Sequence, residues 1–199
     1  CCGVERVYVE APIYDRFCEA AVAFAEALKI GDPKTEGTNL GPMAQPNAPG
    51  FLQNQVEEAR AKGARILCGG APTHHDGKGR FFAPTVAVDT DHAMAIAREE
   101  SFGPVVAIQK VSGDEEALGR MNDSELGLTA SVWTNDVARA KRLLPRIEAG
   151  TVFLNRADYL DPLLAWTGVK DSGKGVSLSQ LGLQAVTRPK SYHLRTQIG

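Results

Sequence analysis

Short runs of β-branched residues alternate with helical stretches along most of this chain. Four of the runs are PTVAVDT, PVVAIQKV, LTASVWT and GTVFLN, and helical stretches occur at about 91–99, 113–122 and 135–148. Strands that alternate with helices usually pair in parallel and are covered by helices on both faces of the sheet. The sequence therefore predicts an α/β fold with three layers, α/β/α, around a mainly parallel sheet. Pro145 should kink the last of these helices or end it early.

The first third of the chain continues this alternation. A strand is expected at 7–9 and a helix at 15–28, where the apolar or small residues at helical spacing are Phe17, Ala20, Ala21, Phe24 and Leu28. A long loop rich in glycine and proline follows at 37–50. It leads to a helix that ends at Gly63 and to a short buried strand, Arg65–Cys68.

The composition and the charge exclude several classes of partner. The chain has 199 residues, of which 43% are hydrophobic and 23% are charged, and its formal net charge is -2. Its basic residues are dispersed, so the sequence offers no attraction for nucleic acid or for an anionic lipid surface. No apolar run approaches the roughly 20 residues that cross a bilayer, and no signal-peptide pattern opens the sequence. We therefore expect a cytoplasmic protein that binds neither nucleic acid nor membrane.

The cysteines and histidines do not follow a metal-binding pattern. The four cysteines lack the C-x-x-C spacing of a structural zinc site and are too few for a disulfide scaffold, so reduced thiols are expected; they are Cys1, Cys2, Cys18 and Cys68. His74 and His75 are neighbours in a glycine-rich stretch, THHDG, and point in divergent directions. Since a metal site needs several convergent ligands, we expect a solvated loop there and no metal.

The sequence can be compared with two glycine-containing motifs that bind nucleotides, the phosphate-binding loop and the dinucleotide fingerprint. GVKDSGKG has the G-x-x-x-x-G-K spacing of a phosphate-binding loop in Gly168, Gly173 and Lys174, but Gly175 replaces the hydroxyl residue that binds magnesium. We interpret it as a loop in which glycine permits a close approach. The G-x-G-x-x-G fingerprint is also absent, so any dinucleotide must be bound mainly outside this chain.

The segment REESFGPVVAI places two carboxylates, an aromatic ring and a Gly-Pro corner before a buried strand. The carboxylates, Glu99 and Glu100, could accept a hydrogen bond from a ribose hydroxyl, and Phe102 could offer a flat apolar face to a ring. The alternative is a helix end whose acids face water and whose Phe102 belongs to the core. The segment alone leaves both interpretations open.

Six segments that are spread along the chain form a series: CCGVERVYV, FFAPTV, REESFGPVVAI, NDSELGLTASVWTND, AGTVFLN and VKDSGKG. In sequence, order and spacing this series resembles the aldehyde dehydrogenase superfamily. Together they run over essentially the whole chain, and several motifs in series are far more specific than any one of them. The match is to the C-terminal, catalytic portion of the family. The resemblance therefore implies the catalytic-domain fold, with the cofactor domain outside these residues.

The resemblance assigns the nucleophile to the first residue. In the family the nucleophilic cysteine lies five residues before an arginine and a hydrophobic strand, and the spacing from Arg6 selects Cys1, with Cys2 as its neighbour. A thiolate adds to an aldehyde carbonyl to give a thiohemiacetal, hydride leaves for the nicotinamide, and water hydrolyses the resulting thioester. The implied reaction is oxidation of an aldehyde to a carboxylic acid with NAD or NADP. The alternative for both cysteines is an inert place in the core.

The resemblance also implies roles for five further residues. Glu100 would hydrogen-bond the nicotinamide ribose, and Phe102 would pack near the nicotinamide. Leu160 and Trp166 match positions at the mouth of the substrate tunnel, and Asn155 matches the asparagine that ends the AGTVFLN strand. Ordinary packing is the alternative for Leu160 and Trp166. Relatives usually have P-F-G-G-x-K-x-S-G where this chain has AWTGVKDSG, so the resemblance does not fix the aldehyde.

In the family, the general base and the oxyanion-hole asparagine precede the nucleophile, so neither is expected in this chain. We therefore expect the isolated chain to show no dehydrogenase turnover. A terminal Cys1 would also be a 1,2-aminothiol, which condenses with aldehydes to a thiazolidine. The alternative function is a non-catalytic truncated subunit, or an interaction module that pairs with a separate cofactor-binding half.

The sequence suggests two parts, a catalytic domain at 1–187 and a C-terminal strand or arm at 188–199. The tail RPKSYHLRTQ is polar and alternating. In the family the last strand joins an oligomerisation sheet, so the resemblance implies a homo-oligomer formed through this strand. Without partner strands it would be an exposed edge. The other implied partner is a small-molecule aldehyde.

Overall fold

The computed structural model describes all 199 residues and divides them into two compact units, Cys1–Ser124 and Glu125–Gly199. The sequence suggested a different boundary, between residues 187 and 188, which would separate a catalytic domain from an oligomerisation arm. That boundary stays a prediction.

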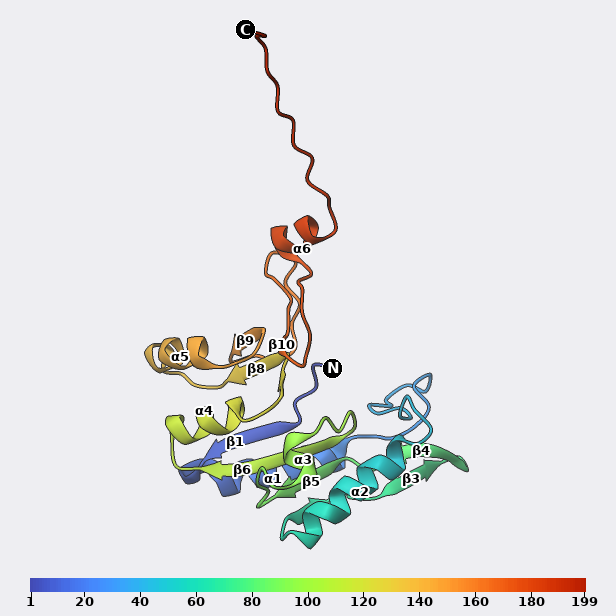
Figure 1. Cartoon of the computed structure of the whole chain (residues 1–199). Helices are drawn as coiled ribbons and strands as arrows, with labels where there is room; N and C mark the ends of the chain where they lie inside the picture. Colours follow the sequence, from blue (N-terminus) through green and yellow to red (C-terminus); the bar gives the residue numbers. More distant parts are fainter. The chain divides into compact units, whose positions relative to one another are not determined.

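The first unit contains six strands, four α-helices and one 3-10 helix (Figure 1). In chain order they are β1 (Arg6–Glu10), η1 (Ala11–Ile13), α1 (Tyr14–Ala27), α2 (Ala48–Ala61), β2 (Arg65–Cys68), β3 (Pro72–His75), β4 (Lys78–Phe82), β5 (Thr85–Val88), α3 (Ala95–Arg98), β6 (Val105–Val111) and α4 (Asp114–Asn122). Helix α1 ends at Ala27, shortly before the IGDP segment at 30–33, and α2 ends at Ala61, just before Gly63, as the sequence predicts.

The central sheet has the strand order β1-β6-β5-β2. Strands β1, β6 and β5 are parallel, with Arg6 opposite Ala107 and Thr85 opposite Val105. Strand β2 pairs antiparallel with β5 at the edge. The expected α/β class with a parallel-rich sheet is therefore confirmed. Because β2 lies at the edge and is only half-buried, its prediction as a buried strand is wrong.

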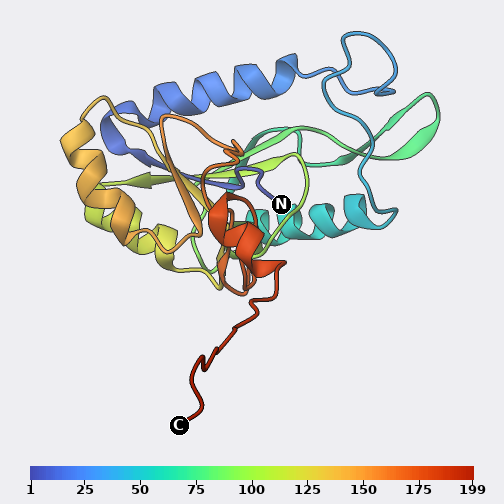
Figure 2. The same cartoon turned by 90° about the horizontal axis from the view of Figure 1, so that it is seen from above.

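Buried side chains form two clusters, and neighbouring residues of β5 belong to different ones. Val86 and Val88 pack with α1, whereas Ala87 packs with residues of α2. Since successive side chains of a strand point to opposite faces, the two helices cover opposite faces of the sheet. Figure 2 shows α1 in blue and α2 in teal on either side of the strands.

A hairpin occupies the stretch that was expected to be a solvated loop. Strands β3 and β4 pair antiparallel around Asp76 and Gly77, which both have positive φ angles. Two consecutive positive φ angles are typical of the tight turns that join hairpin strands, and Asp-Gly is a preferred pair there. The loop prediction for THHDG was therefore wrong.

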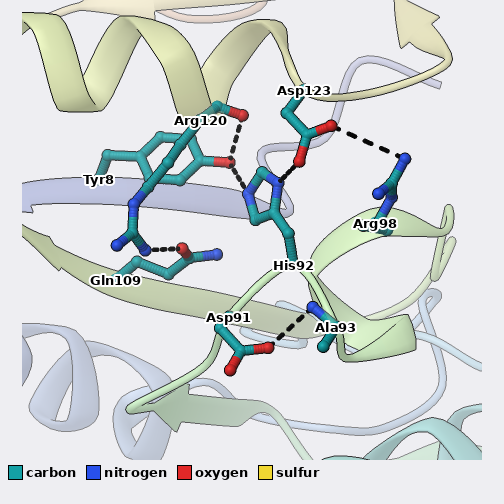
Figure 3. A network of polar contacts seen from close by, with 8 residues as sticks. All are labelled: Tyr8, Asp91, His92, Ala93, Arg98, Gln109, Arg120 and Asp123. Atoms are coloured by element: carbon teal, nitrogen blue, oxygen red, sulfur yellow. Dashed lines mark hydrogen bonds and ion pairs between the residues drawn. The ribbon is translucent and has the colours of Figure 1, made fainter.

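A polar network joins β1 to the end of α4 (Figure 3). The Tyr8 hydroxyl lies 2.9 Å from His92 Nε2 and also donates to the Arg120 carbonyl, at 3.2 Å. On the other side of the ring, His92 Nδ1 lies 2.6 Å from Asp123 Oδ2. Burial raises the pKa of the Tyr8 phenol, and the hydrogen bond from His92 lowers the pKa of the Asp123 carboxyl. The network thus ties residues more than eighty positions apart.

The second unit contains short elements. They are β7 (Leu126–Gly127), β8 (Thr129–Val132), α5 (Val137–Leu143), η2 (Leu144–Arg146), β9 (Thr151–Leu154), β10 (Val169–Lys170) and α6 (Ser179–Ala185). Strands β8 and β9 are parallel, and β7 pairs antiparallel with β10. Helix α5 gives way to η2 just before Pro145, as expected from the missing amide of proline. Residues 188–199 form no helix or strand in the single chain.

The helix expected at 91–99 is shorter in the structure, because Asp91 bonds the Ala93 amide and α3 begins only at Ala95. None of the helices combines the length and the apolar character needed to span a membrane.

Candidate functional site

The first residues of β1 and of β6 lie at the same end of the central sheet, because the two strands are parallel neighbours. Cys1 precedes β1 by five residues. Glu100 and Phe102 precede β6, in the loop that joins it to α3. The parallel pairing therefore brings the segment with the candidate nucleophile to the end of the sheet that also carries the two candidate cofactor residues.

Glu5 connects these two segments directly. The Ser101 amide donates to Glu5 Oε2 and the Phe102 amide donates to Glu5 Oε1, each at 2.9 Å. The Glu5 backbone carbonyl accepts the Ala107 amide, also at 2.9 Å. Hydrogen bonds to an ionised acceptor are stronger than those between neutral groups. Glu5 could not be identified from the sequence, because a carboxylate just before a strand carries no local signal of a partner 96 positions away.

Phe102 has an unusual backbone conformation and an exposed ring. Its φ is 51°, in the left-handed region, and 55% of the residue is exposed. For a residue with a Cβ atom, that region costs about 1–2 kcal/mol. Ser101 beside it is buried, and Glu100 is exposed. The interpretation of Phe102 as a core residue is therefore wrong: the loop presents an aromatic ring and a carboxylate to the outside.

The four cysteines are all thiols, but their surroundings differ. Cys1 is exposed, so it is not an inert core residue, and Cys2 is half-buried. Burial raises the pKa of the Cys18 thiol and that of the Cys68 thiol. Since the thiolate is the nucleophile, a raised pKa makes these two thiols less reactive at neutral pH.

The three candidate substrate residues belong to the second unit. Leu160 is exposed, and Trp166 is half-buried and exchanges two backbone hydrogen bonds with Ser177, at 2.8 and 2.9 Å. Asn155 follows β9; its side-chain amide donates to the Thr134 carbonyl and its Oδ1 accepts the Thr134 amide, each at 2.8 Å. Asn155 therefore holds the segments that follow β8 and β9 together.

The loop that contains Leu160 also carries exposed polar and apolar groups. The Arg156 guanidinium lies over the ring of Tyr159, with its Cζ 3.6 Å from the ring centroid. Leu163 and Leu164 are both exposed. The loop therefore presents a cation and several apolar side chains to the outside.

A comparison with protein families gives a match to the aldehyde dehydrogenase family over residues 1–192. The chain belongs to the aldehyde dehydrogenase family. Succinate-semialdehyde dehydrogenase [NADP(+)] of Mycobacterium avium is 39% identical over 191 residues, which are 96% of this chain and 40% of that protein. Succinate semialdehyde dehydrogenase [NAD(P)+] Sad of Escherichia coli is 43% identical over 183 residues, or 92% of this chain and 39% of that protein.

Solved structures of the family have the same fold. Betaine aldehyde dehydrogenase of Staphylococcus aureus, in a double mutant solved with NAD+, superposes with a TM-score of 0.85 at 32% identity. The alignment covers 90% of this chain and 36% of that chain. The present chain thus spans about two fifths of the length of the family members that it matches.

Proposed function

We propose that this chain forms the catalytic-cysteine domain of an NAD- or NADP-dependent aldehyde dehydrogenase, with Cys1 as the nucleophile. One observation carries the proposal: the exposed Cys1 thiol belongs to the segment that enters β1, at the same end of the sheet where Glu100 and Phe102 are exposed. Family membership gives this arrangement its chemical meaning. The relatives are named for the oxidation of aldehydes with NAD(P), and this proposal extends that activity to the present chain.

The residues of the loop before β6 fit the nicotinamide end of such a cofactor. The exposed Glu100 carboxylate can accept a hydrogen bond from a ribose hydroxyl, and the exposed Phe102 ring offers a flat apolar face. When bound, the cofactor supplies the acceptor for the hydride. The rest of its binding surface is proposed to come from the part of the relatives that this chain does not cover.

The Cys1 sulfur performs the covalent steps. Its thiolate forms a bond to the carbonyl carbon of the aldehyde while the carbonyl oxygen takes up a proton, which gives a thiohemiacetal. Loss of the hydride from that carbon to the acceptor, and of the hydroxyl proton to solvent, would leave the thioester. At the acyl stage, water adds to the thioester carbon, the carbon–sulfur bond breaks, and the carboxylic acid leaves as the thiol is restored. Leu160 and Trp166 are proposed to line the substrate entrance, and Asn155 to shape it by holding the nearby turn.

A chimeric enzyme tests this function. This chain replaces the matching 183 residues of the E. coli succinate semialdehyde dehydrogenase, and aldehyde-dependent reduction of NADP+ is recorded by absorbance. The chimera is expected to be active, with succinate semialdehyde and hexanal as alternative substrates. Cys1→Ser should lower kcat by roughly four orders of magnitude, because the hydroxyl is a far weaker nucleophile.

Cys2→Ser is the matched control, since it changes the neighbouring thiol and should retain activity within a few-fold. The isolated 199-residue chain should give no turnover. A folded chimera that binds NADP+ but lacks activity would contradict the proposal and favour a non-catalytic module. Equal losses for Cys1→Ser and Cys2→Ser would contradict the assignment of the nucleophile.

We also propose that residues 188–199 pair with a second copy of the chain. They form no strand in the single chain and are exposed throughout. An unpaired extended segment is a template for pairing with another strand. Light scattering after gel filtration should show a dimer or larger assembly that becomes monomeric when residues 189–199 are deleted. An unchanged mass after deletion would exclude this tail as the interface.

A further inference from the structure

Glu5 stands at the point where the nucleophile segment meets the loop before β6. Both oxygens of its carboxylate accept consecutive backbone amides of that loop, from Ser101 and Phe102. Its own carbonyl accepts the Ala107 amide, so the backbone of Glu5 is fixed by the sheet. Because the Glu5 backbone is fixed, its carboxylate holds the Ser101 and Phe102 amides in a defined place.

The two amides lie where the loop most needs external support. Phe102 is in the left-handed region of backbone conformation and is more than half exposed. A strained conformation persists only when the surrounding structure determines it. Neither Ser101 nor Phe102 lies in a helix or strand. Their amides therefore bond the Glu5 carboxylate instead of the backbone carbonyls of a neighbouring strand or helical turn.

We propose that Glu5 is a positioning residue for cofactor binding: its carboxylate holds the loop so that Glu100 and Phe102 face the nicotinamide end of the cofactor. This inference rests on the proposed function. It assigns to a residue next to the nucleophile segment a role in the affinity for the cofactor, exerted through the backbone of another segment.

The chemistry requires a glutamate-like carboxylate. Two neighbouring N–H groups need two acceptors, and the ionised carboxylate offers both at once. In Glu5→Gln one acceptor becomes an NH2 group, which faces a backbone N–H and cannot bond it. Glu5→Asp keeps both oxygens on a side chain one methylene shorter, so it should restore part of the contact. Glu19→Gln is the control, because it removes an exposed carboxylate of α1.

The first measurement is amide hydrogen exchange by NMR on the 199-residue chain. In the unmodified chain the Ser101 and Phe102 amides should exchange slowly although Phe102 is exposed. In Glu5→Gln their exchange should accelerate about tenfold or more, while amides in the middle of β6 keep their rates. Glu19→Gln should change neither. Because this measurement needs no cofactor, it tests the contact separately from the enzyme activity.

The second measurement uses the chimeric enzyme described above. Glu5→Gln should raise KM for NADP+ about tenfold and leave KM for the aldehyde within about twofold. The KM of Glu5→Asp for NADP+ should lie between that of the unmodified chimera and that of Glu5→Gln. A general loss of structure would instead lower kcat and shift both KM values, and the thermal midpoint would fall.

The outcomes separate the two proposals. If the Ser101 and Phe102 amides of the unmodified chain exchange at the rates of an unstructured peptide, the inference is overturned, even if the variant fails to fold. Faster exchange with an unchanged KM for NADP+ also overturns it. An unmodified chimera without activity counts against the proposed function, while protected amides would still establish the contact of Glu5.

Discussion

Gly69 shows how a single residue constrains the turn between β2 and β3. Its φ is +69°, and a Cβ atom there would lie 2.2 Å from the Pro84 carbonyl oxygen and 2.6 Å from Thr85 Oγ1. The carbonyl belongs to the backbone and cannot rotate away. Both the conformation and the close approach therefore require glycine.

Gly69→Ala should accordingly destabilise the first unit by about 2–5 kcal/mol, as the sum of a left-handed backbone cost and an overpacked contact. The midpoint of urea unfolding, followed by circular dichroism, measures the change. The control is Gly119→Ala in α4, where the added Cβ has no atom within 4 Å apart from its two chain neighbours and the backbone of its own helix. It should stabilise by about 0.5–1 kcal/mol, since alanine favours a helix. Equal effects of the two changes would refute the argument.

Asp123 gives a prediction for the dependence of stability on pH. Its pKa is lowered first by the hydrogen bond from His92 and further by the charge of Arg98. A carboxyl whose pKa is lower in the folded state stabilises the fold above its unfolded pKa, about 3.9, and loses this effect as the pH falls through the folded value.

Asp123→Asn should therefore be less stable than the unmodified chain at pH 7, and the difference should shrink below about pH 4. Urea unfolding between pH 7 and pH 2.5 measures it, with Glu19→Gln as the control. The variant should still lose stability in acid, because Glu116, bonded by Ser112 and Arg120, has a pKa of about 2. A difference independent of pH would show that the ionisation of Asp123 does not contribute.

At the scale of the element, α1 shows why a periodic sequence can leave a face undecided. The sequence predicts apolar or small residues along a stripe that contains Phe17 and Phe24, yet Phe24 is 70% exposed. The buried stripe is the neighbouring one, with Tyr14, Cys18 and Ala25. Tyr14, Cys18 and Ala25 share a cluster with Val86 and Val88 of the sheet, so the position of the sheet, and not the size of the side chains, decides which stripe is buried.

The hairpin β3–β4 was missed although the sequence contains its signal. Asp76-Gly77 is a preferred turn pair for two-residue hairpins. The flanking residues, however, do not alternate between apolar and polar, because Phe81 and Phe82 are both buried and lie at the end of β4. Without alternation, the turn signal alone resembled that of a loop.

At the scale of the whole molecule, the buried clusters belong entirely to the first unit. Both consist of residues between Val9 and Ile108. In the second unit only Ala140 and Ile147 are buried among the hydrophobic residues. Since apolar burial is the main favourable contribution to folding, the first unit should account for most of the stability.

Hydrogen exchange followed by mass spectrometry should therefore detect two levels of protection. Peptides from β5 and β6 should exchange only through global unfolding of the first unit, whereas peptides from β8 and β9 should exchange faster, through local opening. Pepsin fragments from both units, analysed from the same sample, provide the internal comparison. Equal protection of β6 and β9 would indicate a single cooperative unit instead.

The amino-acid sequence alone was enough to place strands β1, β5, β6, β8 and β9 and helices α1, α2 and α4, and to predict the α/β class, the early end of α5 at Pro145 and the family motifs. These features depend on local spacing, on proline and glycine chemistry, and on residue types read in series. The folded chain was needed to show which face of α1 is buried, that β2 runs antiparallel at the edge, and that Glu5 bonds Ser101 and Phe102. Those contacts join residues up to 97 positions apart. Their energy depends on geometry that arises only when the sheet has formed, so local sequence carries no trace of it.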